Sequence, residues 1–144
     1  MPKITRAGLL AGLAALPFAG LPFAALTFAG AAQAATTTQR VRFPRGTMGT
    51  ILRGRVRGYD TADYLVGARA GQQMTVSLRS DNDSNYFNIT APGAREALFQ
   101  GAMEGGDARF TTPRNGDYVV RVYLMRNAAR RGEVGAFTLE ISIQ

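Results

Sequence analysis

Apolar and polar residues alternate with a period of two along much of the chain after residue 40, the pattern of strands that bury one face. Runs of this kind cover 50–57, 64–69, 73–79, 118–124 and 137–143. Turn-forming residues separate them, namely Ala70-Gly71, Asp81–Asn85, Ala91-Pro92-Gly93, Glu104–Asp107 and Asn115-Gly116. Seven or eight short strands at about this spacing predict an all-β fold, an antiparallel β-sandwich.

Two segments lack this alternation. Residues 94–103 have no clear period, and they fit either a strand or a single helical turn. Residues 35–40 are rich in threonine, and we interpret them as a linker that precedes a β-sandwich domain at 41–144.

The N-terminal region has the features of an export signal. Lys3 and Arg6 precede an apolar stretch at 7–30, and Ala32 and Ala34 suit the small-residue positions of a cleavage site. The stretch is longer than a usual signal core, so a retained membrane anchor is the alternative. We expect a signal peptide at 1–34, a periplasmic or secreted bacterial protein, and no stable membrane insertion after cleavage.

The composition of residues 35–144 excludes several kinds of chemistry. They contain no cysteine, histidine or lysine, which removes Cys/His zinc sites and Ser-His-Asp triads. We therefore expect no enzyme, no cofactor and no metal. The chain's seventeen basic residues include Lys3 and Arg6, so fifteen arginines face ten acids after cleavage, a net charge of about +5. This positive charge favours binding to anionic lipids, acidic polymers or an acidic cleft in another protein. Export and the lack of a binding motif argue against nucleic acid.

The acidic residues fit turns better than functional sites. The run Asp81–Asn85 begins like a calcium loop, but Tyr86 and Pro92 stand where an EF-hand needs glycine and glutamate. Asp60 and Asp63 are close in the chain, as a glycosidase pair would be in space. Asx-type hydrogen bonding in a turn is the preferred interpretation of both aspartates.

Arginines form two candidate binding surfaces. Arg53, Arg55 and Arg57 share one face of a strand, either as a binding surface or as a solvated edge that discourages sheet pairing. Arg126 and Arg130 are four residues apart, so one helical turn would place both guanidinium groups on the same side. Two such groups suit the capture of carboxylates in a concave partner, and generic loop charge is the alternative.

Several short motifs occur between Val41 and Ile143, and their order and spacing match those of a known protein family. They are Gly58-Tyr59-Asp60, Tyr64, Ala70-Gly71-Gln72, Tyr86-Phe87, Gly116-Asp117-Tyr118, Arg121-Val122 and Arg126-Asn127-Ala128-Ala129-Arg130. With these motifs the chain resembles the family of periplasmic inhibitors of g-type lysozyme. The Gly-Tyr-Asp and Arg-Asn-x-Ala-Arg motifs are its specific part.

The resemblance implies a β-sandwich whose loops enter the substrate cleft of a g-type (goose-type) lysozyme and so protect bacterial peptidoglycan. The implied contacts are Tyr59 on the early turn and Arg126 and Arg130 on the late one, with Asp60 and Asn127 as supporting polar contacts. One departure is Asn115-Gly116, where many lysozyme inhibitors have Ser-Gly, and it puts any contact of that serine in doubt. The alternative function is a secreted jelly-roll adhesion or carbohydrate-binding module for anionic cell-envelope glycans. A homodimer through an edge strand also stays open.

Overall fold

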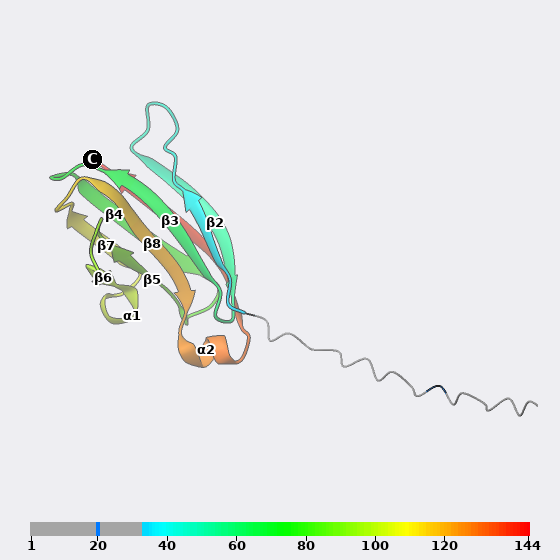
Figure 1. The fold of residues 1–144 in the computed structure, drawn as a ribbon. Helices are drawn as coiled ribbons and strands as arrows, with labels where there is room; N and C mark the ends of the chain where they lie inside the picture. Colours follow the sequence, from blue (N-terminus) through cyan, green and yellow to red (C-terminus); the bar gives the residue numbers. More distant parts are fainter. Residues whose placement is uncertain (1–19, 21–32) are drawn as a thin grey trace, which may run out of the picture. The chain divides into compact units, whose positions relative to one another are not determined.

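The computed structural model describes residue 20 and residues 33–144, so nearly all of the expected signal peptide at 1–34 lies outside the described residues. Residues 33–144 form nine strands in two sheets, with two short helices (Figure 1). This confirms the predicted all-β sandwich. No helix in the described part of the chain has the length and apolar character needed to cross a membrane.

The first sheet has the order β1-β3-β8-β5-β6. Its strands are β1 (Thr36–Arg40), β3 (Thr61–Ala68), β8 (Gly116–Leu124), β5 (Asn85–Thr90) and β6 (Phe99–Gln100). Neighbouring strands are antiparallel except β1 and β3, which pair in parallel.

The second sheet has the order β2-β9-β4-β7 and is antiparallel throughout. Its strands are β2 (Gly49–Arg57), β9 (Val134–Ile143), β4 (Gln73–Ser80) and β7 (Asp107–Thr111). The helices are α1 (Gly101–Glu104) and α2 (Arg126–Arg130).

The alternating apolar positions form a single core between the sheets. Its fully buried side chains include Val66, Met74, Val76, Phe87, Ile89, Tyr118, Val120, Val122, Leu139 and Ile141. Tyr64 and Phe137 meet edge to face across the core, with ring centroids 6.2 Å apart. Gly54 lies beside them on β2, where a Cβ atom would be 2.6 Å from Phe137 Cζ and 2.8 Å from Tyr64 Oη. The lack of a side chain at Gly54 leaves room for this aromatic pair.

The structure differs from the sequence interpretation at both irregular segments. The expected linker at 35–40 contains strand β1, whose five side chains are all exposed. An edge strand with no buried side chain carries no alternation, and main-chain pairing with β3 holds it in place. The ambiguous segment 94–103 contains both expected forms, because strand β6 runs directly into helix α1.

Three connections between the sheets lie at the same end of the sandwich. The registers place Arg57 beside Val134, Ser80 beside Phe137, and Asn85 beside Leu124. The β2–β3 turn (58–60), the β4–β5 turn (81–84) and the β8–β9 connection with α2 (125–133) therefore leave the sheets together. We call this the α2 end; Figure 1 shows α2 at the tip of the sheets.

Candidate partner-binding site

Helix α2 has one buried and one exposed side. Ala128 and Ala129 are 0% and 3% exposed and pack into the core, whereas Arg126 and Arg130 are exposed. The two small alanine side chains let the helix lie directly against the sandwich. Because residues four apart are neighbours on a helix surface, the two arginines share one side. The single helical turn considered from the sequence is confirmed.

Backbone hydrogen bonds fix α2 at both ends. Before the helix, the Met125 amide donates to the Ser84 carbonyl on the β4–β5 turn at 2.8 Å. After it, the amides of Arg131 and Glu133 both donate to the Ala128 carbonyl, at 3.1 and 3.2 Å. A helix of five residues is too short to be stable alone, so these attachments keep its arginines in place.

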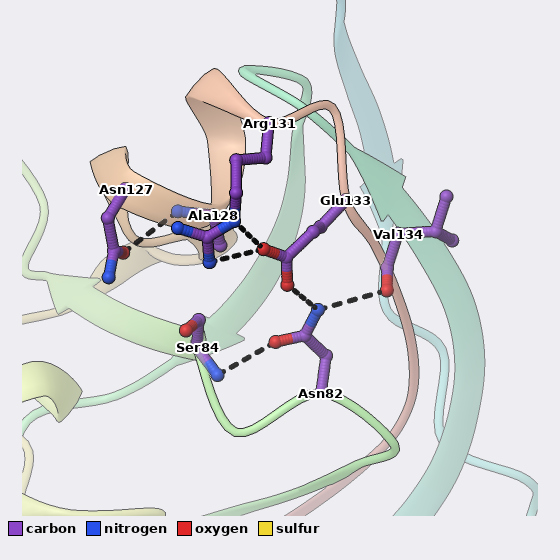
Figure 2. A network of polar contacts seen from close by, with 7 residues as sticks. All are labelled: Asn82, Ser84, Asn127, Ala128, Arg131, Glu133 and Val134. Atoms are coloured by element: carbon purple, nitrogen blue, oxygen red, sulfur yellow. Dashed lines mark hydrogen bonds and ion pairs between the residues drawn. The ribbon is translucent and has the colours of Figure 1, made fainter.

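A polar network supports the chain that leaves α2 (Figure 2). The side-chain amide of Asn82 donates to the Glu133 carboxylate at 3.1 Å and to the Val134 carbonyl at 3.2 Å. The side-chain oxygen of Asn82 accepts a hydrogen bond from the Ser84 amide at 2.9 Å. Arg131 Nε donates to Glu133 Oε2 at 2.6 Å. The hydrogen bonds from Asn82 and then Arg131 hold the pKa of Glu133 below its usual range.

This network changes the interpretation of two sequence features. Of the three arginines near α2, Arg131 is paired with Glu133, whereas Arg126 and Arg130 form no ion pair within residues 33–144. The run Asp81–Asn85 contains the β4–β5 turn, as expected, and ends at the first residue of β5. Through the Ser84 carbonyl this turn also holds the start of α2. Asp81 Oδ1 accepts a hydrogen bond from the Ala136 amide at 2.9 Å. Within the described residues no group of three or more acids, histidines or cysteines could hold a metal ion.

The turn that carries Tyr59 lies against the α2 connection. The Gly58 amide donates to the Glu133 carbonyl at 2.9 Å, and a Cβ atom at Gly58 would lie 3.6 Å from the Ala129 carbonyl oxygen. Gly58 has φ 57°, a conformation that favours glycine. Tyr59 follows with 54% of its surface exposed. Tyr59 and the α2 arginines therefore lie on adjacent, bonded connections at one end.

The two supporting residues of the expected site both have partners inside the chain. Asp60 Oδ1 accepts a hydrogen bond from the Ala35 amide at 2.8 Å. Asn127 Oδ1 accepts one from the Ala128 amide at 2.8 Å, in the first turn of α2. Each side chain thus helps to shape the element that carries it.

Asp60 and Asp63 do not converge on one cleft. Asp63 lies on β3 and is 8% exposed, and both of its carboxylate oxygens accept hydrogen bonds of 2.7 Å from Arg121 on β8. The hydrogen bond to Asp63 raises the pKa of Arg121. The expectation that Asp63 shapes a turn is wrong, because the register places it opposite Arg121 in the sheet.

The β-sandwich is shared with solved inhibitor structures. PliG from Aeromonas hydrophila, a periplasmic lysozyme inhibitor of g-type lysozyme, is 38% identical with a TM-score of 0.73, over 78% of this chain and 100% of that one. The chain belongs to this inhibitor family. PliG from Salmonella Typhimurium is 26% identical with a TM-score of 0.63, over 75% of this chain and 98% of that one.

Further comparisons agree with this family. The inhibitor of g-type lysozyme of Escherichia coli (strain K12) is 25% identical over 114 residues, which cover 77% of this chain and 84% of that protein. A pre-peptidase C-terminal domain of Bacillus anthracis collagenase, 17% identical with a TM-score of 0.52, shares the fold alone. No protein-family model matches the chain. Membership of the inhibitor family confirms the resemblance seen in the sequence and the expectation that the chain is not an enzyme.

Proposed function

We propose that the protein is a periplasmic inhibitor of g-type lysozyme and that its α2 end occludes the enzyme's substrate cleft. One observation carries the site assignment. The Gly58–Glu133 hydrogen bond of 2.9 Å joins the turn of Tyr59 to the connection of Arg126 and Arg130. The two arginines and the aromatic ring can therefore enter one concave surface together.

The two arginines supply the electrostatic part of the proposed interaction. A lysozyme cleft presents carboxyl groups for catalysis. Arg126 and Arg130 have no acidic partner within the described residues, so contact with those carboxyl groups breaks no internal ion pair. A guanidinium group that reaches a carboxylate forms short, charge-assisted hydrogen bonds. The attached α2 backbone also lowers the conformational entropy lost on binding.

Tyr59 supplies the apolar part. Its exposed ring is large and has few rotatable bonds, and such rings bury much area at low entropic cost. A sugar subsite of the cleft suits this ring and its hydroxyl group. Asp60 and Asn127 flank the three anchors, and each retains one side-chain polar atom for a supporting contact with the enzyme.

Inhibition of a g-type lysozyme tests this function. Purified protein should inhibit cleavage of peptidoglycan stoichiometrically, and added substrate should compete with it. Hen-type and invertebrate-type lysozymes, assayed in parallel, measure the selectivity. Failure to inhibit goose-type lysozyme at micromolar concentration would contradict the proposal.

The row of arginines on β2 can be explained without a binding role. Arg53, Arg55 and Arg57 are exposed on the edge strand of the second sheet, and none forms an ion pair within residues 33–144. Charge on an edge strand discourages pairing with another sheet. Binding to insoluble peptidoglycan or lipopolysaccharide without lysozyme, weakened steeply by salt, would instead support the carbohydrate-binding alternative. A homodimer through an edge strand stays a prediction, and sedimentation tests it.

A further inference from the structure

The hydrogen bonds that join the N-terminal segment to the sandwich begin at Ala35, the first residue after the predicted cleavage site. Strand β1 starts at Thr36, and the preceding residue, Ala35, already has two hydrogen bonds. Its amide donates to Asp60 Oδ1 at 2.8 Å, and its carbonyl accepts from the Thr61 amide at 2.9 Å. Gln33 and Ala34 are exposed and belong to no strand.

We propose that cleavage between Ala34 and Ala35 creates an N-terminal ammonium group that pairs with the Asp60 carboxylate and so fixes the turn that carries Tyr59. A signal peptidase hydrolyses this peptide bond with one water molecule. Ala34 leaves with the new carboxylate, and the nitrogen of Ala35 becomes an amine that is protonated at neutral pH. The existing amide-to-carboxylate hydrogen bond then becomes an ion pair, which is the stronger kind of contact.

The cleavage also alters the surface next to Tyr59. A cavity of about 210 Å³ lies between Gln33, Ala34, the turn from Arg57 to Asp60, and Gly132. Removal of Gln33 and Ala34 takes away one wall of this cavity. The charged side chains that line this cavity are Arg57 and Asp60, and Tyr59 is the remaining titratable one. The new ammonium group therefore has one like charge, Arg57, and one opposite charge, Asp60, beside it.

A single reactive amine makes the proposal directly testable. Lys3 is the chain's one lysine, so the processed protein has no amine except the α-amino group of Ala35. The full chain is exported in a Gram-negative host and purified from the periplasm, and its intact mass should correspond to residues 35–144. An acetylating reagent is then applied between pH 6 and pH 10, and the rate of labelling is measured.

We expect Asp60→Asn to be labelled about two- to fivefold faster at pH 7, because an exposed ion pair stabilises the unreactive ammonium form by that order. The substitution keeps an oxygen that can accept the Ala35 bond, and thermal unfolding checks that the fold is retained. Asp83→Asn, which removes an exposed acid from the β4–β5 turn, should be labelled like the parent.

Two outcomes overturn the proposal: an N-terminus at a residue other than Ala35, or identical labelling of the parent and Asp60→Asn. Neither measurement uses lysozyme. The proposal can therefore fail while the inhibitor function stands, and the reverse also holds.

Discussion

The side-chain amide of Asn82 donates a hydrogen bond of 3.1 Å to the carboxylate of Glu133, 51 residues further along the chain (Figure 2). This bond joins the β4–β5 turn to the connection that follows α2. Glu133 also accepts a hydrogen bond from Arg131 through its side chain and one from Gly58 through its carbonyl. One glutamate thus links all three connections of the α2 end.

The Glu133 network predicts a pH-dependent contribution to stability. The pKa of Glu133 is below its usual range in the folded protein, chiefly because Asn82 and then Arg131 donate hydrogen bonds to it. Its contribution is therefore complete above the ordinary carboxyl pKa and is lost as the pH falls through the lower folded value. Glu133→Gln should lower the unfolding temperature at pH 7 and have a smaller effect at about pH 3. An equal decrease at both pH values would rule out this linkage.

The paired arginines of α2 should dominate inhibition. The double variant Arg126→Ala/Arg130→Ala is expected to raise the inhibition constant at least about tenfold, on the order of 1.4 kcal/mol. Because both side chains are exposed, its unfolding temperature should stay close to that of the parent. Arg53→Ala/Arg55→Ala removes the same charge from β2 and serves as the control. If both double variants lose inhibition equally, net charge and not the α2 site controls binding.

Tyr59 should contribute through its ring more than through its hydroxyl group. Truncation of a buried aromatic anchor typically costs about 2 kcal/mol or more, so Tyr59→Ala should weaken inhibition by roughly thirtyfold. Tyr59→Phe keeps the ring and should retain most of the affinity. Titration calorimetry with the lysozyme measures both. Unchanged affinity of Tyr59→Ala would remove this residue from the site.

The glycine in the aromatic core should matter for stability and not for inhibition. A Cβ atom at Gly54 would lie 2.6 Å from Phe137 Cζ, so Gly54→Ala must displace packed rings at a cost of about 1–3 kcal/mol. Gly67→Ala is the matched control on β3, because its nearest contact is the Asp117 side chain at 3.5 Å. Urea unfolding compares the two variants. Equal midpoints would show that the core adapts without cost.

Much of the fold could be predicted because side-chain burial leaves a local pattern. Val120 and Val122 on β8, or Leu139 and Ile141 on β9, recur at alternate positions, since successive residues of a strand point to opposite faces. Strand β1 was missed for the complementary reason. Its side chains are all exposed, and it joins the sheet through main-chain bonds that do not depend on residue type.

The candidate site also contains residues that the sequence could predict and residues that it could not. The motifs around Tyr59, Arg126 and Arg130 marked the candidate residues, and the four-residue spacing of the arginines placed both on one side of a helical turn. Asn82 and Glu133 were not found as supports, although the polar run Asp81–Asn85 marked the turn. Their hydrogen bond joins residues 51 positions apart, which no local pattern records.

By itself, the sequence determined the strands that have a regular apolar face, their core positions and the family resemblance, since each depends on side chains that are close together in the chain. Only the tertiary structure decided that Tyr59 lies beside α2. The β2–β3 turn and the β8–β9 connection both cross between the sheets at the same end, because β2 pairs with β9 and β3 pairs with β8. That proximity follows from strand register and direction, which are properties of the assembled sheets and not of either segment alone.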